Sequence, residues 1–324
     1  MNFSQLLKQT RNLTLIGATI LLFSQCNRDD HELPTIADNP VDIDTVDFDA
    51  TPYDLDFGSF PAPKMTDNML TTQGVKLGRM LFYETMMSRD NSISCASCHK
   101  QENAFSDPDQ FSSGVDGSLG KRQAMSVFNL AWHTMINSER ISLALEQFMN
   151  SIVSNHSRFD AFLGNEITLS ATEERGRTLF FAEYNPAFPD ESGADCAHCH
   201  GGANFDNNRY MNNGLDEEAN QSDIGRQNVT NDPMDKAKFK VPSLRNVELT
   251  PPYMHDGRFT SLEQVVDHYD HGIELSPTVD LALEYTTQTG LMLSIQDKAD
   301  LIAFLKTLTD DQLTTDQRYI DPHR

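Results

Sequence analysis

The chain has 324 residues, enough for two domains of ordinary size, and a formal net charge of −23 at pH 7. It holds 25 Lys and Arg against 48 Asp and Glu, and this excess of acid excludes a broad nucleic-acid-binding function. The negative charge suits a basic partner through electrostatic steering, and solubility alone would explain it equally well.

The first 26 residues are predicted to be an export signal rather than part of the fold. Lys8 and Arg11 precede a largely apolar run of 11 residues that ends at Phe23, too short to span a membrane. Cys26 follows at the position where a bacterial lipoprotein is acylated, although Gln25 departs from the usual small residue. We expect lipidation at Cys26 and anchoring in the periplasm or at the cell surface. The alternative is simple secretion with Cys26 removed.

Residues 27–64 are predicted to form a tether. They contain ten acidic residues, two basic residues and five prolines. Such a segment has little apolar surface to bury and repels itself, so we expect it to be extended.

Two short motifs share one pattern, Cys-x-x-Cys-His, which is the attachment signal for a c-type haem. Two thiols on one helical turn add to the vinyl groups of the porphyrin, and the adjacent His supplies the proximal imidazole to iron. The attachment thiols and proximal ligands are then Cys95, Cys98 and His99 in the first motif, and Cys196, Cys199 and His200 in the second.

Other uses of these cysteines fit the sequence poorly. A four-Cys zinc site has its pairs about 15–20 residues apart, whereas 97 residues separate Cys98 from Cys196 here. A redox dithiol does not need a His directly after both pairs. The sequence therefore predicts two covalently bound haems.

The surroundings of the two motifs repeat one plan. The segment Gly78–Tyr83 recurs as 176–181, and each lies shortly before a haem motif and closes a helical pattern. A small residue followed by Leu and an aromatic allows two helices to cross closely. The second helix is predicted to begin at a capping box formed by Ser170 and Glu173.

Each motif is also followed, after a long loop, by a periodic helix. The first carries apolar residues from Ile141 to Ile152, and the second runs from Leu301 to Leu308 with Ser294 or Asp297 as its start. Strand signals are few. The sequence predicts an all-α fold of two tandem cytochrome c-like domains, produced by internal duplication. The expected boundaries are 65–156 for the first domain, 157–170 for a linker, 171–312 for the second domain and 313–324 for a tail.

The second axial ligand decides what a haem of this kind does. A His/Met pair raises the potential and gives electron transfer, whereas an open face allows chemistry on a small molecule. Met254 follows two prolines and precedes Gly257, so it lies in a stiff turn that suits a weak thioether ligand. We favour Met254 over its neighbour His255. The other methionines available in this half are Met211, Met234 and Met292.

From about residue 74 to 308 the chain resembles the bacterial dihaem cytochrome c peroxidases. The strongest part of the likeness is Phe-Lys-Val-Pro-Ser-Leu-Arg-Asn-Val at residues 239–247. The other matching segments are 77–82, 91–99, 104–107, 155–160, 196–200 and 250–257.

This resemblance implies a division of labour between two haems. The carboxy-terminal haem, with ligands His200 and Met254, would accept electrons from a small periplasmic donor such as a cytochrome c or a cupredoxin. The amino-terminal haem, with the ligand His99, would bind hydrogen peroxide and reduce it to water. The family also tends to dimerise, which suggests a homodimer.

The chain departs from the family pattern in its first half. Family members can carry a displaceable His in the loop after the first haem, where this chain has Val115. After Trp132, which does not match the family Trp and is expected to pack, the chain passes from Asn137 directly to Ser138 and the closing helix. Some tens of residues are missing, including the family's catalytic Glu, so no catalytic residue is assigned.

Several interpretations follow from this departure. The protein is a peroxidase that borrows another acid, for which Asp116 or Glu102 are candidates, or a non-enzymatic dihaem electron-transfer protein, or the product of a gene with an internal deletion. His133 or Met135 could close the first iron and abolish peroxidase chemistry, or be ordinary loop residues. A dihaem oxidase acting on a protein partner is a further alternative, but that type often has Tyr where this chain has Met254.

The resemblance also suggests a calcium ion between the domains, which the family holds with an Asn side chain and backbone carbonyls. This chain has Gln123 at that position. Gln offers a carbonyl oxygen at a different reach, so calcium at Gln123 is left open.

Overall fold

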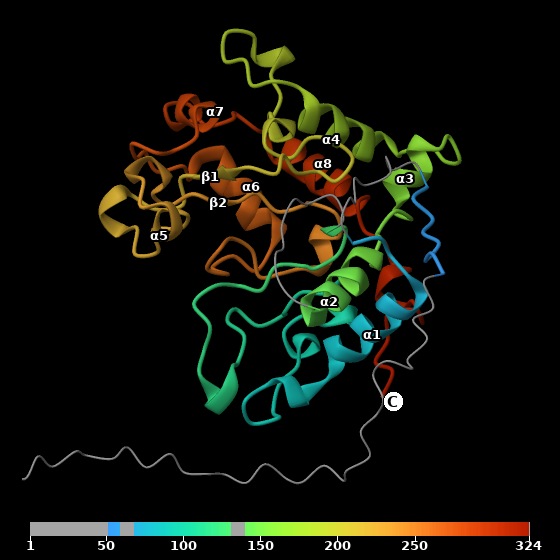
Figure 1. The fold of residues 1–324 in the computed structure, drawn as a ribbon. Helices are drawn as coiled ribbons and strands as arrows, with labels where there is room; N and C mark the ends of the chain where they lie inside the picture. The colour runs from blue at the N-terminus through green and yellow to red at the C-terminus, as the bar shows by residue number, and fades with distance from the viewer. Residues whose placement is uncertain (1–50, 59–67, 131–139, 324) are drawn as a thin grey trace, which may run out of the picture. The chain divides into compact units, whose positions relative to one another are not determined.

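The computed structural model describes residues 51–58, 68–130 and 140–323 (Figure 1). The predicted leader with Cys26, most of the tether, and the segment with Trp132, His133, Met135 and the shortened loop at Asn137 lie outside the described residues. No helix among the described residues is long and apolar enough to cross a membrane.

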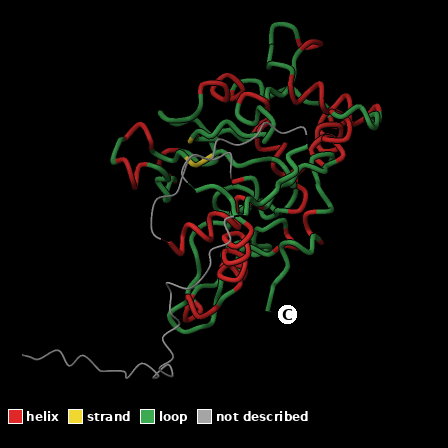
Figure 2. Tube along the Cα trace, turned by 45° about the vertical axis from the view of Figure 1, so that its right-hand side comes forward, coloured by secondary structure: helices red, strands yellow, loops and turns green. Residues whose placement is uncertain are grey.

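Short helices joined by long loops make up most of the described chain, as Figure 2 shows. The only sheet in these residues pairs β1 (Tyr210–Met211) with β2 (Phe239–Lys240) in antiparallel register, Tyr210 opposite Lys240. The mostly helical prediction is confirmed. The helices are α1 (Thr72–Tyr83), α2 (Arg140–Ser151), α3 (Arg158–Leu163), α4 (Ala171–Phe181), α5 (Gln227–Thr230), α6 (Leu262–His271), α7 (Leu281–Glu284) and α8 (Ile295–Lys306).

The predicted helix starts are confirmed by their caps. Ser170 and Glu173 form the capping box of α4, in which each side chain accepts a hydrogen bond from the other residue's backbone N–H. Ser294 is the cap of α8 and Asp297 completes its capping box. Both residues proposed as the start of this helix therefore take part.

Two helix pairs, α1 with α2 and α4 with α8, lie side by side (Figure 1). A Cβ atom added to Gly78 on α1 would lie 1.9 Å from the carbonyl oxygen of Ala144 on α2. A Cβ added to Gly176 on α4 would lie 1.9 Å from the carbonyl oxygen of Asp300 on α8. The predicted close crossing at the small residue is thus confirmed in both halves.

Each helix pair encloses its own aromatic core. In the first, Phe82 and Phe148 are buried with ring centroids 5.2 Å apart. In the second, Phe180 and Phe304 are buried at the same separation of 5.2 Å. The two cores are separate clusters of buried residues, one built on α1 and α2 and the other on α4, α6 and α8.

The carboxy-terminal tail packs against the first core although it follows the second half in sequence. Tyr319 is 1% exposed and its hydroxyl donates to the carbonyl of Ser151 at the end of α2, 2.9 Å away. Gln101, just after the first haem motif, donates to the carbonyl of Leu313 at 3.1 Å. The tail therefore completes the first core.

Two asparagines, Asn129 and Asn246, hold the ends of the closing helices in matching ways. The backbone N–H of Asn129 donates to Ile152 after α2 (2.8 Å), and its side chain accepts from the N–H of Ser154 (2.9 Å). The N–H of Asn246 donates to Leu308 after α8 (3.0 Å), and its side chain accepts from the N–H of Asp310 (2.8 Å). Neither asparagine is exposed.

The two arrangements are also bonded to each other. The side-chain amide of Asn246 donates to the Ser154 hydroxyl (2.9 Å), which donates to Asp310 (3.1 Å). The amide of Asn129 donates to Asn204 in the second half (3.2 Å). A buried polar network thus joins the halves, and its groups satisfy one another, as buried polar groups must.

A buried ion pair, Arg245 with Asp160, joins the strongest family segment to α3. The guanidinium donates two hydrogen bonds to the carboxylate, at 2.9 and 2.8 Å, and a third to the carbonyl of Ala203 at 3.0 Å. Burial alone would raise the pKa of Asp160, but Arg245 lowers it below its usual value of 3.8. The pair fixes the loop after His200.

Replacing Gly176 by Ala should lower the free energy of unfolding by about 1 to 3 kcal/mol, because the added methyl group overlaps a helix backbone that cannot move aside. Urea unfolding followed by circular dichroism measures this. Gly120→Ala is the control, since its Cβ would meet no atom closer than 3.5 Å. Equal stability of the two variants would contradict the close-packing argument.

Asp160→Asn should destabilise the protein by about 3–5 kcal/mol at pH 7, because it removes the carboxylate that accepts two hydrogen bonds from a buried guanidinium. The double variant Asp160→Leu, Arg245→Leu should lose much less. The folded-state pKa of Asp160 is depressed, so the pair stabilises above pH 3.8 and this stabilisation is lost as the pH falls through the lower folded-state pKa. Unfolding curves at pH 7 and pH 3 distinguish the variants, and a double variant as unstable as the single would refute this account.

Candidate haem sites

The first motif forms a short 3₁₀ turn at Cys95–Ser97. The N–H groups of Cys98 and His99 both donate to the carbonyl of Cys95, at 3.2 and 3.0 Å. This turn places both thiols and the imidazole on one compact loop, and both thiols are free. The arrangement suits attachment of one porphyrin.

The second motif repeats the turn at Cys196–His198, where the N–H of His200 donates to the carbonyl of Cys196 at 2.9 Å. Cys196 packs against the second core. Burial raises the pKa of Cys196 and of Cys199 to about 12, so both are protonated thiols at neutral pH. Apolar walls of this kind suit a porphyrin face.

The two imidazoles are held in the same way. Nδ1 of His99 lies 3.0 Å from the carbonyl oxygen of Phe105. Nδ1 of His200 lies 3.2 Å from the carbonyl oxygens of both Phe205 and Pro242. A carbonyl only accepts, so each Nδ1 carries the proton and each Nε2 keeps a free lone pair. This is the tautomer that binds a metal through Nε2.

The phenylalanines that supply these carbonyls have matching backbones. Phe105 and Phe205 are buried, with positive φ angles of 58° and 52°. The left-handed turn directs the carbonyl back toward the imidazole, and the ring is inserted into the core of its half. Burial lowers the pKa of His99, and it lowers that of His200 to about 4, so both rings are neutral at pH 7. The residues present therefore fit two haems.

Met254 lies in a tight loop between β2 and α6. The N–H of Tyr253 donates to the carbonyl of Phe259 (2.7 Å), and the N–H of Gly257 donates to the carbonyl of Met254 (3.3 Å). The Tyr253 hydroxyl also donates to Val247 (3.0 Å). Met254 itself has a φ of 74°, so the stiff turn predicted around it is present.

The alternative ligands lie in different surroundings. The ring of His255 stacks on Phe239, with centroids 3.8 Å apart and planes 10° apart. Met234 and Met292 are exposed, and Met211 is in β1 with its sulfur accepting from Asn207 at 3.2 Å. The sulfur of Met254 accepts from Asn213 at the same distance.

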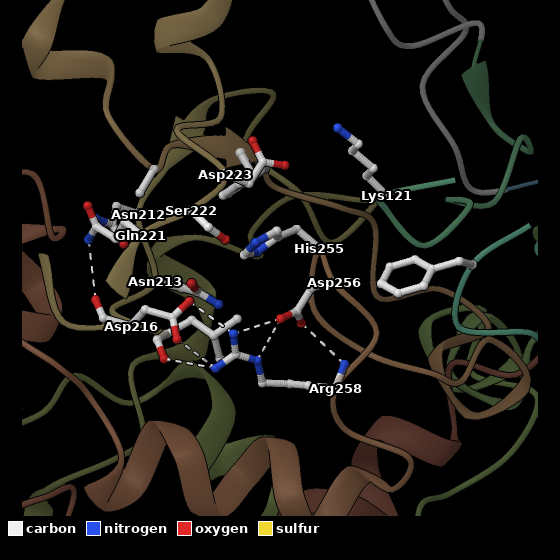
Figure 3. A pocket seen from close by; sticks show the side chains of 14 residues that line it. Lys121, Asn212, Asn213, Asp216, Gln221, Ser222, Asp223, His255, Asp256 and Arg258 are labelled. Carbon is white, nitrogen blue, oxygen red and sulfur yellow. Dashed lines mark hydrogen bonds and ion pairs between the residues drawn. The ribbon is translucent and has the colours of Figure 1, made fainter. Parts of the chain in front are cut away.

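A polar cavity of about 260 Å³ adjoins the Met254 loop (Figure 3). Arg258 bonds there to Asp216 and to Asp256, both at 2.8 Å, and His255 and Lys121 also line it. Its volume is below the range of pockets for drug-sized ligands, and a porphyrin is larger still. The cavity is therefore not a haem site.

Gln123 lies where the first half meets the second. Its N–H donates to the carbonyl of His255 (3.1 Å) and its amide nitrogen donates to the carbonyl of Asp107 (2.8 Å). The described residues contain no group of three or more acidic, His or Cys side chains placed to hold a metal ion. A calcium ion here would depend on the Gln123 carbonyl oxygen and the backbone, and it stays a prediction.

The candidate acids are both exposed. Asp116 lies in the loop bounded by Ser113 and Leu119 and forms an ion pair with Arg89. Glu102 lies in the turn between His99 and Phe105. Neither is brought beside His99 by any contact in the described residues, and Val115 is half-buried in the same loop as Asp116.

Sequence reasoning missed the asparagine pair and the two phenylalanine carbonyls. A signal for the asparagines was present: Ser-Val-Phe-Asn at 126–129 and Ser-Leu-Arg-Asn at 243–246 share a Ser-x-x-Asn spacing. No comparable signal marked the phenylalanines, because the distance from the motif His differs by one residue between the halves.

Comparisons with known proteins find similar sequences. The family model described as di-haem cytochrome c peroxidase matches residues 72–139. A methylamine utilization protein MauG from Methylorubrum extorquens is 28% identical, covering 77% of this chain and 81% of the relative. Cytochrome c peroxidase Ccp from Escherichia coli is 29% identical, covering 73% and 58% respectively.

A solved structure is similar over most of the chain. The crystal structure of a MauG-like protein associated with microbial copper homeostasis aligns with a TM-score of 0.71 at 30% identity, covering 85% of this chain and 100% of that one. The fold is thus that of two cytochrome c-like domains, and the paired Cys-x-x-Cys-His sites are consistent with two c-type haems. The chain belongs to the di-haem cytochrome c peroxidase and MauG family.

Proposed function

We propose that this protein is a di-haem enzyme that reduces hydrogen peroxide to two waters, taking two electrons from a small periplasmic donor such as a cytochrome c or a cupredoxin. The observation that carries the proposal is a pair of matching haem motifs, one of which shares its half of the chain with a stiff loop that bears a thioether. Within the described residues, His99 and His200 are held alike by backbone carbonyls, and Met254 lies in that loop of the second half.

Each residue has a distinct task in this proposal. Cys95, Cys98, Cys196 and Cys199 attach the haems, which when bound supply redox-active iron. The Nδ1–H groups of His99 and His200 donate to carbonyl oxygens, so Nε2 of each ring is available to the metal. Met254 supplies a weak sulfur ligand from a stiff loop, which favours electron transfer at the second site. The first site stays accessible to peroxide.

A non-enzymatic electron-transfer protein is the second candidate. The exposure of Asp116 and Glu102 favours it, because proton transfer to peroxide needs an acid held within hydrogen-bond reach. A di-haem oxidase acting on a protein partner, which the family resemblance also raises, is the third. Met254 in place of Tyr disfavours it.

The proposal also covers the domain boundaries, the location of the protein, its oligomeric state and a calcium ion. The domains are 65–156 and 171–312 with the linker 157–170, and the tail is 313–324. Export to the periplasm or cell surface, a lipid anchor on Cys26, a homodimer and calcium at Gln123 are proposed on the sequence and the resemblance.

The haem-loaded full chain should carry two covalent haems, and the variant Cys196→Ala, Cys199→Ala should carry one. A pyridine haemochrome assay counts them. Asp116→Asn, an exposed change away from both motifs, is the control and should keep two. A wild-type count below two would remove the basis of the proposal.

With a reduced donor, the wild type should consume one peroxide for every two electrons. Met254→His should slow turnover by about tenfold or more, because a second imidazole lowers the potential at the site where electrons enter. Peroxide-dependent oxidation of a reduced donor measures the stoichiometry and the rate. Met292→Leu, which changes an exposed methionine, is the matched control.

An electron paramagnetic resonance spectrum can contradict the proposed peroxidase activity. Two low-spin, six-coordinate irons that do not respond to peroxide would leave only an electron-transfer protein.

A further inference from the structure

Asn213 lies between the Met254 loop and α6. Its side-chain nitrogen is 3.2 Å from the sulfur of Met254, within the range of a hydrogen bond to a thioether. Asn213 therefore lies against the sulfur of the methionine that is proposed as the axial ligand.

The backbone around Asn213 is fixed from two directions. Its carbonyl accepts from Nε2 of His268, a buried residue of α6, at 3.0 Å. The preceding residue Asn212 is 3% exposed, and its amide donates to Thr278 at 3.0 Å. Gly214 follows with a φ of 63° and donates its N–H to the Asn212 side chain at 2.9 Å. The amide of Asn213 is thus held in position.

A thioether sulfur has two lone pairs. With one directed at iron, the other is free to accept an N–H, and the positive end of that dipole then lies beside the metal. A nearby positive partial charge stabilises the form of the site that carries one charge less, which is the reduced form.

We propose that Asn213 is a positioning residue for the second haem: its amide orients the Met254 sulfur, strengthens that ligand and raises the potential of the site. The inference rests on the proposed function, since it requires Met254 to be the axial ligand.

The chain provides a matched control. Asn207 donates to the sulfur of Met211 at the same 3.2 Å, in the same half of the protein, but from a loop that leads into β1. Removing this second Asn–Met contact tests whether any such change alters the haem, or only the one at Met254.

The experiment compares Asn213→Leu with Asn207→Leu in the haem-loaded full chain. Redox titration should show a lower midpoint potential for one haem in Asn213→Leu, and a weaker thioether-to-iron charge-transfer band. Added imidazole should bind to the second haem about fivefold more tightly, because the sulfur that it displaces has lost one hydrogen bond of about 1 kcal/mol. Asn207→Leu should match the wild type in all three measurements. Asn213→Ala is the second variant, used if the Leu variant does not retain two haems.

The two failures are distinguishable. If the wild type lacks the charge-transfer band, or Met254→Leu leaves it in place, the axial-ligand assignment in the proposed function is wrong. If the wild type has the band and Met254→Leu removes it, but the Asn213 variants keep the wild-type potential and imidazole affinity, the inference about Asn213 is overturned.

Discussion

The structure depends on the buried hydrogen bonds of Asn129 and Asn246. Each asparagine closes the helix that ends its own half and bonds to a residue of the other half, Asn204 and Ser154 respectively. Because both side chains are fully buried, breaking one contact would leave a polar group without a partner in a medium that cannot replace it. A network satisfied on every side tolerates little sliding, so the two haem motifs are held in a defined relation.

This junction includes residues of the loop that follows the second haem motif. Asn204 precedes Phe205, whose carbonyl holds His200, and its backbone carbonyl accepts from Ser243 at 2.6 Å. Arg245, two residues later, binds the carbonyl of Ala203 and the carboxylate of Asp160. The residues that join the halves therefore also fix the imidazole of His200. A shift at the junction would move this ring, because Asn204 and Phe205 are adjacent in the chain.

Local patterns predicted the helices well. Capping boxes at Ser170 and Ser294, and the glycine crossings at Gly78 and Gly176, depend on residues three or four apart or on one small side chain, and the structure has them all. The return of Tyr319 to the first core could not be read in the same way, because its partner at Ser151 is far away in sequence. The left-handed carbonyls of Phe105 and Phe205 were also hidden, since non-glycine residues rarely adopt that backbone.

Both halves hold an imidazole by the same means, so any difference in chemistry must come from the other side of each site. In the second half, a stiff loop and an amide donor hold one thioether. In the first half, the loop after the haem motif carries Val115 and an exposed ion pair between Arg89 and Asp116. The segment that follows Asn129, as the Met254 loop follows Asn246, lies outside the described residues. Because the two imidazoles are held alike, the groups on the opposite side of each site decide whether a haem there passes electrons or receives a small molecule.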